Sequence, residues 1–109
     1  MILHEHPELQ AELVRRLVEV YHPKQIFLFG SQAWGIPGEQ SDVDIYIVLE
    51  NSTESLAGRI YHGTKAVYGL PVAVDLLVFT EEEVADRIRH PATLEHKIWT
   101  KGKMLYEAA

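Results

Sequence analysis

An apolar stripe with helical spacing occupies the first part of the chain. Its members recur every three or four residues and are Leu9, Leu13, Leu17 and Val20. Side chains spaced in this way lie on one face of a helix. Pro7 suits a first helical turn, and Pro23 disfavours helical backbone at the residue before it. The pattern therefore predicts an amphipathic helix from about Pro7 to Tyr21.

Three short apolar runs follow, and their lengths are typical of strands rather than helices. They are Gln25–Phe29, Val43–Leu49 and Val72–Phe79. The second run alternates, so that one face of its strand carries Val43, Ile45, Ile47 and Leu49. Between the first two runs, the glycines and the proline of residues 31–41 predict a short helical turn and then a loop.

Capping signals predict three further helices. Asn51 and Glu54 have the spacing of an N-terminal cap, and a helical stripe follows them. Thr80 and Glu83 fit a capping box that opens a short helix. A last helix is expected over residues 91–102, opened by its proline and closed by its glycine.

Taken in order, these elements predict an α+β fold in a single domain over residues 1–109. One layer of helices would pack on a mixed sheet of three strands, which gives a two-layer architecture. Met104–Tyr106 would add a fourth strand at the edge of that sheet. We find no internal repeat, linker or low-complexity tract in the chain.

Composition and charge narrow the choice of functions. Ten Lys and Arg against sixteen Asp and Glu give a formal charge of −6, which disfavours binding to nucleic acid through general electrostatics. The lack of cysteine excludes disulfides, thiolate chemistry and cysteine zinc sites. Apolar runs such as Ile45–Leu49 are too short to cross a membrane, and the first residues do not follow a signal-peptide pattern. We therefore expect a cytoplasmic protein without membrane contact.

Asp42 and Asp44 are the first candidates for chemistry. At positions i and i+2 of a strand they point to the same face, about 6.5–7 Å apart along the chain. Two carboxylates at that separation can hold a hard cation, and Mg²⁺ takes one or two carboxylates together with water or phosphate oxygens. The alternative is a pair of solvated acids at the start of a surface strand.

Asp75 lies within the continuously apolar run Val72–Phe79, where both faces of the strand are expected to be buried. An ionised carboxylate there is costly unless it is paired or bound to a metal. One alternative is a purely structural acid, satisfied by a backbone amide or by Arg59 or Lys65. If the second and third strands are neighbours, Asp75 faces the same pocket as the other two aspartates, where mutual repulsion is tolerable only around a cation.

Gly30 and Ser31 follow a buried strand and precede the predicted helical turn. Backbone N–H groups and a hydroxyl in that place can hold phosphate oxygens, and glycine allows a close approach. An ordinary turn would have the same sequence. The two residues are expected at the end of the sheet that carries Asp42.

Together these residues resemble the signature of the DNA polymerase β-type nucleotidyltransferase superfamily, and in particular its smallest members, the minimal nucleotidyltransferases or MNT domains. The family pattern is a Gly-Ser turn, a glycine four residues after the serine, a Ser-Asp-x-Asp motif and a third carboxylate on a later strand. The matching residues are Gly30, Ser31, Gly35, Ser41, Asp42, Asp44 and Asp75. The resemblance covers essentially the whole chain.

The resemblance implies a polymerase β-like fold and a defined chemistry. The catalytic and metal-binding residues would be Asp42, Asp44 and Asp75, which would hold two Mg²⁺ ions or Mn²⁺ in their place. The nucleotide-binding residues would be Gly30, Ser31, Gly35 and Ser41. The reaction would transfer a nucleoside monophosphate, with AMP from ATP as the expected case, to an acceptor hydroxyl and release pyrophosphate.

The chain departs from the family pattern inside the Gly-Ser turn. Many minimal members carry arginines there, where this chain has Gln32 and Trp34. Arginine offers phosphate a fixed fork of donors, whereas tryptophan offers a stacking surface and one N–H. The sequence therefore leaves open how tightly the triphosphate is held and how active the protein is.

Two functions of different classes follow from the resemblance. Minimal members are commonly encoded beside a HEPN-domain protein, as antitoxin and RNase toxin, and some adenylylate a tyrosine of the toxin. The first hypothesis is therefore a protein adenylyltransferase with ATP and a HEPN-type toxin as partners. The second is a non-catalytic antitoxin that neutralises its partner by covering it. Three acids on a sheet favour the enzyme, whereas the acceptor residue, the nucleobase preference and the oligomeric state are not readable from the sequence.

Overall fold

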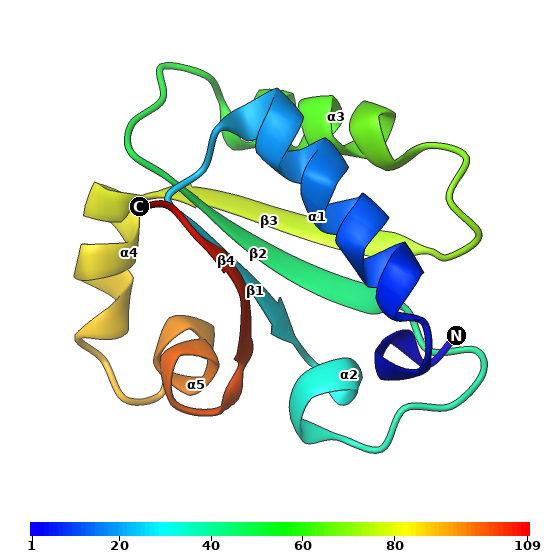
Figure 1. Ribbon diagram of the computed structural model, residues 1–109. Helices are drawn as coiled ribbons and strands as arrows, with labels where there is room; N and C mark the ends of the chain where they lie inside the picture. Colours follow the sequence, from blue (N-terminus) through cyan, green and yellow to red (C-terminus); the bar gives the residue numbers. More distant parts are fainter.

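The computed structural model describes residues 1–109 and contains a four-stranded sheet with helices on both faces (Figure 1). In chain order the elements are the 3-10 helix η1 (Leu3–Glu5), α1 (Pro7–Tyr21), β1 (Gln25–Phe29), α2 (Ser31–Trp34), β2 (Val43–Leu49), α3 (Leu56–Val67), β3 (Val74–Thr80), α4 (Glu81–Ile88), α5 (Leu94–Lys101) and β4 (Lys103–Glu107). The predicted α+β class is confirmed, and the strand expected at Met104–Tyr106 is present within β4. None of the helices combines the length and the apolar character needed to span a membrane.

The sheet is mixed, and its topology decides which strand ends meet. The strand order is β3-β2-β1-β4, so β1 and β2 are central and β4 is an edge strand. β2 runs parallel to β3 and antiparallel to β1, while β4 runs antiparallel to β1. The parallel pair requires the crossover that α3 provides, whereas an antiparallel pair can be joined by a loop. The starts of β2 and β3 therefore lie at the same end of the sheet as the end of β1.

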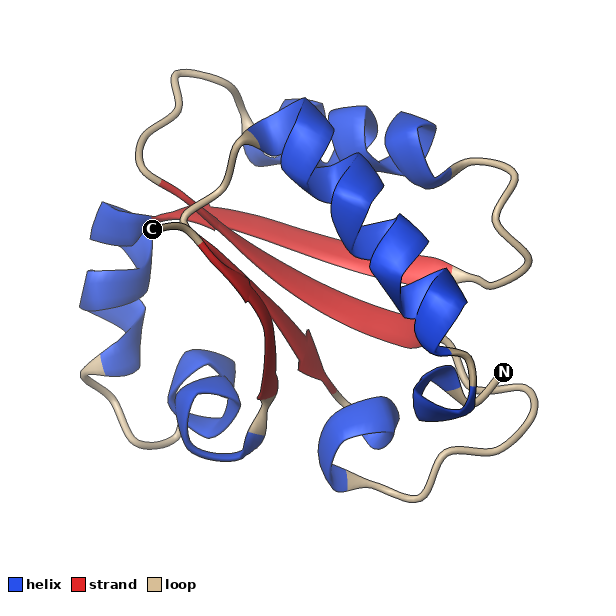
Figure 2. Ribbon diagram, viewed as in Figure 1, coloured by secondary structure: helices blue, strands red, loops and turns tan.

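One face of the sheet packs against α1 and α3 (Figure 2). The apolar stripe of α1 supplies Leu13 and Leu17, which are fully buried as the helical spacing predicts. The strand residues of this core are Ile26, Leu28, Val43, Ile45, Ile47, Leu76 and Val78. The predicted alternation of β2 is thereby confirmed, because the residues expected on one face enter one core.

Helices also cover the other face, which corrects the expectation of a single helical layer. α4 and α5 lie on that side of the sheet (Figure 2). The core beneath them consists of Phe27, Tyr46, Val48, Phe79, Val84 and Ile98. The reason is that the central strands carry apolar side chains on both faces. In β2, Tyr46 and Val48 on one face are as deeply buried as Ile45 and Ile47 on the other.

Two helix starts differ from the sequence prediction because other residues provide the caps. The cap of α3 is Ser55 rather than Asn51, since its hydroxyl accepts a hydrogen bond from the amide of Gly58 at 3.2 Å. α5 begins at Leu94, three residues after the predicted start, with Thr93 as its cap. The capping box predicted at the start of α4 is confirmed, with both of its hydrogen bonds present.

A buried arginine joins three elements on the side of α3. The guanidinium of Arg59 donates to Oε1 of Glu83 at 2.7 Å and to the carbonyl of Val78 at 3.3 Å. The hydrogen bond from Arg59 lowers the pKa of Glu83 from 4.5 to about 2. The ion pair therefore fixes the start of α4 relative to α3 and β3.

Candidate functional site

The register of β2 and β3 brings two predicted carboxylates together. Asp44 and Asp75 are direct partners in the parallel ladder, and Phe29 pairs with Asp44 from the other side. Strand alternation places them on the face that carries Tyr46 and Phe79, the face covered by α4 and α5. These helices do not cover the starts of β2 and β3, where Asp75 is exposed and Asp44 is partly buried. The carboxylates thus stand on an open part of an otherwise covered sheet face.

The exposure of Asp75 corrects the buried position that the apolar run predicted. Its strand starts two residues later than expected and lies at the edge of the sheet, so the first residues have a neighbouring strand on one side only. The structural partners considered from the sequence are used elsewhere. Arg59 binds Glu83, and Nζ of Lys65 lies 5.0 Å from the ring centroid of Tyr61.

The carboxyl of Asp44 carries an electrostatic cost. Partial burial raises its pKa above the usual value of 3.8, and the charges of Asp75 and Asp42 raise it further. A cation among these groups would favour the ionised form of Asp44, because it would offset both the lost solvation and the repulsion. The site is therefore anionic and electrostatically suited to a cation.

The donor set fits a cation that takes part of its shell from a substrate. No group of three or more His, Asp or Glu side chains is arranged to hold a metal ion by itself. Asp44 and Asp75 are paired across the ladder, and Asp42 is exposed just before β2 begins. Mg²⁺ often uses one or two carboxylates and completes its shell with water and substrate phosphate. The assignment of all three aspartates as ligands stays a prediction.

Gly30 places the turn after β1 directly against Asp44. Its backbone has φ 72° and ψ −153°, a combination that is essentially restricted to glycine. A Cβ at this position would overlap Oδ2 of Asp44 and would lie 3.1 Å from its Cγ. The Gly-Ser turn and the carboxylate therefore touch, at the end of the sheet where the sequence placed them.

The other residues of the motif shape the segment around this contact. A Cβ on Gly35 would lie 2.9 Å from Cα of Ser31, so the chain can fold back on the serine only with glycine at this position. The hydroxyl of Ser41 accepts a hydrogen bond from the amide of Gly38 at 2.8 Å. That bond closes the loop before β2, and Ser41 and Asp42 then line a hollow of about 230 Å³.

Gln32, one of the two departures from the family pattern, faces away from a phosphate role. It is 4% exposed, its Oε1 accepts from the amide of Leu3 at 3.1 Å, and its Nε2 donates to the carbonyl of Met1 at 2.6 Å. The side chain therefore anchors the N-terminal segment to α2. Both polar groups of this carboxamide are already bonded within the protein.

Trp34, the second departure, lies on the same sheet face as the carboxylates. The ring centroid of Trp34 is 6.2 Å from that of Phe29. Nζ of Lys97, a residue of α5, lies 4.6 Å from the Trp34 ring centroid. Lys97 was not predictable from the sequence, because no local pattern connects α5 with α2. Only the packing of α5 on the second face brings the lysine to the turn.

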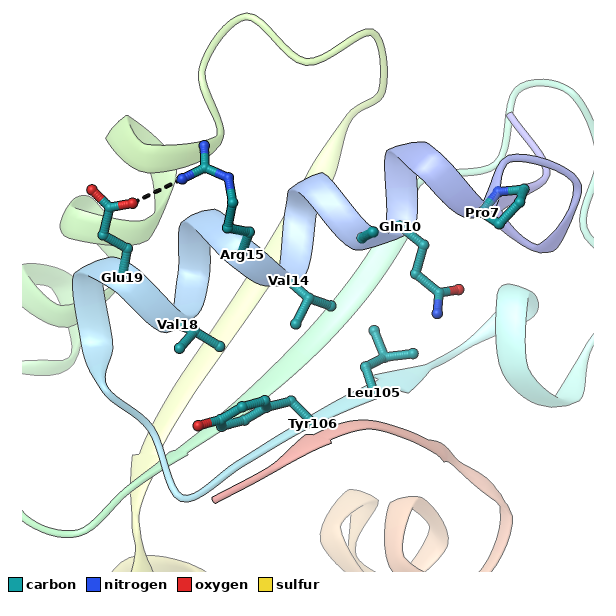
Figure 3. Close-up of a pocket in the computed structure, with 9 residues that line it drawn as sticks. Pro7, Gln10, Val14, Arg15, Val18, Glu19, Leu105 and Tyr106 are labelled. Carbon is teal, nitrogen blue, oxygen red and sulfur yellow. Dashed lines mark hydrogen bonds and ion pairs between the residues drawn. The ribbon is translucent and has the colours of Figure 1, made fainter. Parts of the chain in front are cut away.

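The largest cavity of the molecule lies elsewhere, between α1 and β4 (Figure 3). It has a volume of about 610 Å³ and is open to solvent. Val14 and Val18 of α1 face Leu105 and Tyr106 of β4 across it (Figure 3). None of the predicted site residues lines this groove, and the candidate site remains the open sheet face at Asp44.

The fold and the site define a class of protein. A mixed sheet with paired carboxylates on adjacent strands, next to a glycine-serine turn that touches one of them, is the arrangement expected of a nucleotidyltransferase-type domain. The chain belongs to the nucleotidyltransferase domain family, whose family model matches residues 9–101. The resemblance inferred from the sequence motifs is thereby confirmed.

Solved structures of similar proteins agree with this membership. A protein assigned as a nucleotidyltransferase from Sulfolobus solfataricus has 26% identity and a TM-score of 0.58, with 72% of this chain and 70% of that chain covered. A toxin–antitoxin structure with AMP-PNP has 25% identity and a TM-score of 0.63. A mutant of the toxin–antitoxin MntA-HpeT has 22% identity and the same TM-score of 0.63, so this likeness concerns the fold. Both toxin–antitoxin matches cover 91% of this chain and 73% of the other. No curated protein matches the chain.

Proposed function

We propose that the protein is a divalent-metal-dependent nucleotidyltransferase that transfers AMP from ATP to a hydroxyl of a toxin partner and so acts as its antitoxin. The observation that carries the proposal is the contact of Gly30 with Asp44, whose ladder partner is Asp75. Phosphate-binding backbone and cation-binding carboxylates would then meet at one point of the sheet. The partner expected from the sequence motif is a HEPN-type toxin, with a tyrosine as acceptor.

The similar structures support the nucleotide and the setting. One of them is a toxin–antitoxin with AMP-PNP, which shares the adenosine and the chain of three phosphorus groups of ATP. Another is a toxin–antitoxin variant in which two aspartates, two positions apart, are replaced by glutamate. Asp42 and Asp44 have the same spacing in this chain.

In the proposed reaction the acceptor oxygen forms a bond to the α-phosphorus of ATP, the bond to pyrophosphate breaks, and the hydroxyl proton is lost to water. The side chains of Asp42, Asp44 and Asp75 would hold divalent cations that offset the phosphate charge. The turn that receives the phosphates would consist of Gly30, Ser31, Gly35 and Ser41. Ser41 would act through the loop that its hydroxyl closes, since that hydroxyl already accepts from Gly38.

Calorimetric titration with ATP tests the site directly. Wild type should bind ATP with Mg²⁺ or Mn²⁺ and lose most of this affinity in a chelator, and Asp44→Asn should bind weakly in both conditions. Asp86→Asn is the control, because Asp86 is an exposed acid on α4 whose partner is Arg89. Equal affinities of wild type and Asp44→Asn, with and without metal, would contradict the cation site.

The transfer itself is tested with the product of the neighbouring reading frame as candidate toxin. The purified protein alone should transfer little AMP to free tyrosine, RNA or small alcohols, because positioning of the acceptor supplies much of the rate. With the toxin and ATP, intact-mass spectrometry should find one or more AMP additions on the toxin, dependent on Asp42 and Asp44, together with loss of toxin activity.

A non-catalytic antitoxin is the second candidate. The observations that favour it are the missing arginines at Gln32 and Trp34 and the lack of a self-sufficient group of metal ligands. It predicts full neutralisation of the toxin at unchanged toxin mass, in the absence of ATP, by wild type and Asp44→Asn alike.

A further inference from the structure

One lysine stands over the turn that precedes the candidate site. Lys97 is an exposed residue of α5, and its Nζ lies 4.6 Å from the ring centroid of Trp34, the last residue of α2. Trp34 packs on the same sheet face as the carboxylates, next to Phe29, and Phe29 is the ladder partner of Asp44. Trp34 and Phe29 therefore form a chain of neighbouring side chains between Lys97 and Asp44.

The charge of Lys97 is not used by an acid of the protein. The two nearby arginines, by contrast, form ion pairs. Arg87 of α4 lies 3.7 Å from Glu95, and Arg89 at the end of α4 lies 2.6 Å from Asp86. Lys97 instead rests on an indole face, which attracts a cation without neutralising its charge. Lys97 thus keeps its full positive charge on the sheet face that carries the carboxylates.

We infer that Lys97 binds the β- and γ-phosphates of the nucleotide, and that Trp34 is the surface that positions its ammonium group. This inference rests on the proposed function. The turn itself offers no cationic side chain, and the carboxamide of Gln32 is bonded to the N-terminal segment. An ammonium group is a compact charge that suits phosphate oxygens without a fixed geometry. The positive charge absent from the turn therefore comes from α5.

The test compares nucleotides that differ only in the number of phosphates. Lys97→Met keeps an apolar chain against the indole but removes the charge, and calorimetry would follow ATP, ADP and AMP in excess Mg²⁺. ATP affinity should fall about tenfold or more, the scale of one hydrogen bond to a charged group, while AMP affinity changes less than about twofold. Lys97→Arg should recover most of the ATP affinity, because it restores the charge.

Lys65→Met is the matched control, since Nζ of Lys65 lies 5.0 Å from the centroid of Tyr61 on α3, at the other face of the sheet. It should leave the affinity for all three nucleotides unchanged. Equal ATP affinity in wild type and Lys97→Met would overturn the inference, as would an equal loss for ATP and AMP. If wild type binds ATP with metal, either of these two results rejects the role of Lys97 and leaves the proposed function standing. Failure of wild type to bind ATP overturns the proposed function and the inference together.

Discussion

Gly30 and Asp44 are coupled at the level of single residues. The backbone of Gly30 adopts a conformation that other residues avoid, and it does so at the point where it meets Oδ2 of Asp44. Replacement of the glycine would therefore add backbone strain and displace a carboxylate of the candidate site at the same time.

Gly30→Ala should lower both stability and nucleotide affinity. The strained backbone alone should cost about 1–3 kcal/mol of unfolding free energy, and the added methyl group must push Asp44 aside. Urea denaturation and ATP titration would measure the two effects. Gly38→Ala is the control, because a Cβ there would meet nothing within 4 Å and the backbone does not have a positive φ. Equal stability of Gly30→Ala and Gly38→Ala would contradict the backbone strain expected at residue 30.

Asp75→Asn should separate activity from stability. Transfer should fall on the order of a hundredfold, the usual scale for loss of one group that stabilises developing charge. Stability without metal should be unchanged or higher, because Asp75 is exposed and its charge repels Asp44. Thermal melts in chelator beside a transfer assay would measure both. A less stable and fully active variant would indicate a structural acid instead.

The residues of the site were predictable to the extent that they follow local pattern. The proximity of Asp42 and Asp44 along the chain and the turn at Gly30 could be read directly, because each depends on a few consecutive residues. The expectation that both aspartates lie on the strand was wrong for Asp42, since β2 begins at Val43. The exposure of Asp75 could not, since its run is apolar and only the strand order puts it at an edge. Lys97 was not identified for a similar reason, as its contact with Trp34 depends on how α5 packs.

At the scale of elements, the pair of Arg59 and Glu83 joins α3 to α4. Arg59 is buried, so its charge relies on Glu83 and on backbone carbonyls for compensation. Glu83 also accepts from the amide of Thr80 at 2.8 Å and completes the capping box. One carboxylate therefore serves a helix cap and a contact between helices.

Glu83→Gln should lower the unfolding free energy at neutral pH by about 1–2 kcal/mol, a range reduced because the glutamate is partly exposed. The pKa of Glu83 is about 2 in the folded protein and 4.5 as its ordinary value, so its ionised form favours the folded state. This contribution is complete above pH 4.5 and is lost as the pH falls towards about 2.

The difference in stability between wild type and Glu83→Gln should therefore shrink in this acidic window, as followed by denaturation at several pH values. Glu82→Gln is the control, since Glu82 is exposed on the same helix and makes no ion pair. If the stability difference between wild type and Glu83→Gln stays constant down to pH 2, the substitution acts through packing rather than through the lost charge.

Among the elements, the long periodic and alternating segments were predictable, and the second helical layer was not. α1 and β2 have clear apolar patterns, so their bounds agree with the sequence prediction. When a central strand is apolar on both faces, its sequence does not indicate which helix packs on which face. The cover of Tyr46 by α5 therefore became visible only in the structure, where Tyr46 donates to Glu95 at 2.9 Å.

At the scale of the whole molecule, two cores share one sheet, and the second depends on residues 91–109. The ring centroid of Trp99 lies 4.5 Å from that of Phe27 and 5.8 Å from that of Tyr46. β4 follows directly and occupies the free side of β1. Loss of this segment would uncover an apolar face and a strand edge together.

A chain of residues 1–90 should therefore fail to form the compact protein. It should bind a dye for exposed apolar surface and elute as aggregates, because both changes promote association. Size-exclusion chromatography and dye fluorescence would follow this. A chain that lacks only Ala109 is the control, since the amide of Ala108 still donates to the carbonyl of Lys24 at 2.9 Å. A monomeric 1–90 chain without dye binding would contradict the role of the second core.

The pairing of β4 with β1 has a consequence for synthesis on the ribosome. Synthesis runs from the N-terminus, so β1, β2 and β3, which carry Gly30, Asp44 and Asp75, are made before any residue of α5 or β4. The strands of the site therefore precede the segment that covers Phe27 and Tyr46. In that interval the protein presents the kind of surface that chaperones bind. Only α5 and β4 supply the cover that ends this exposure.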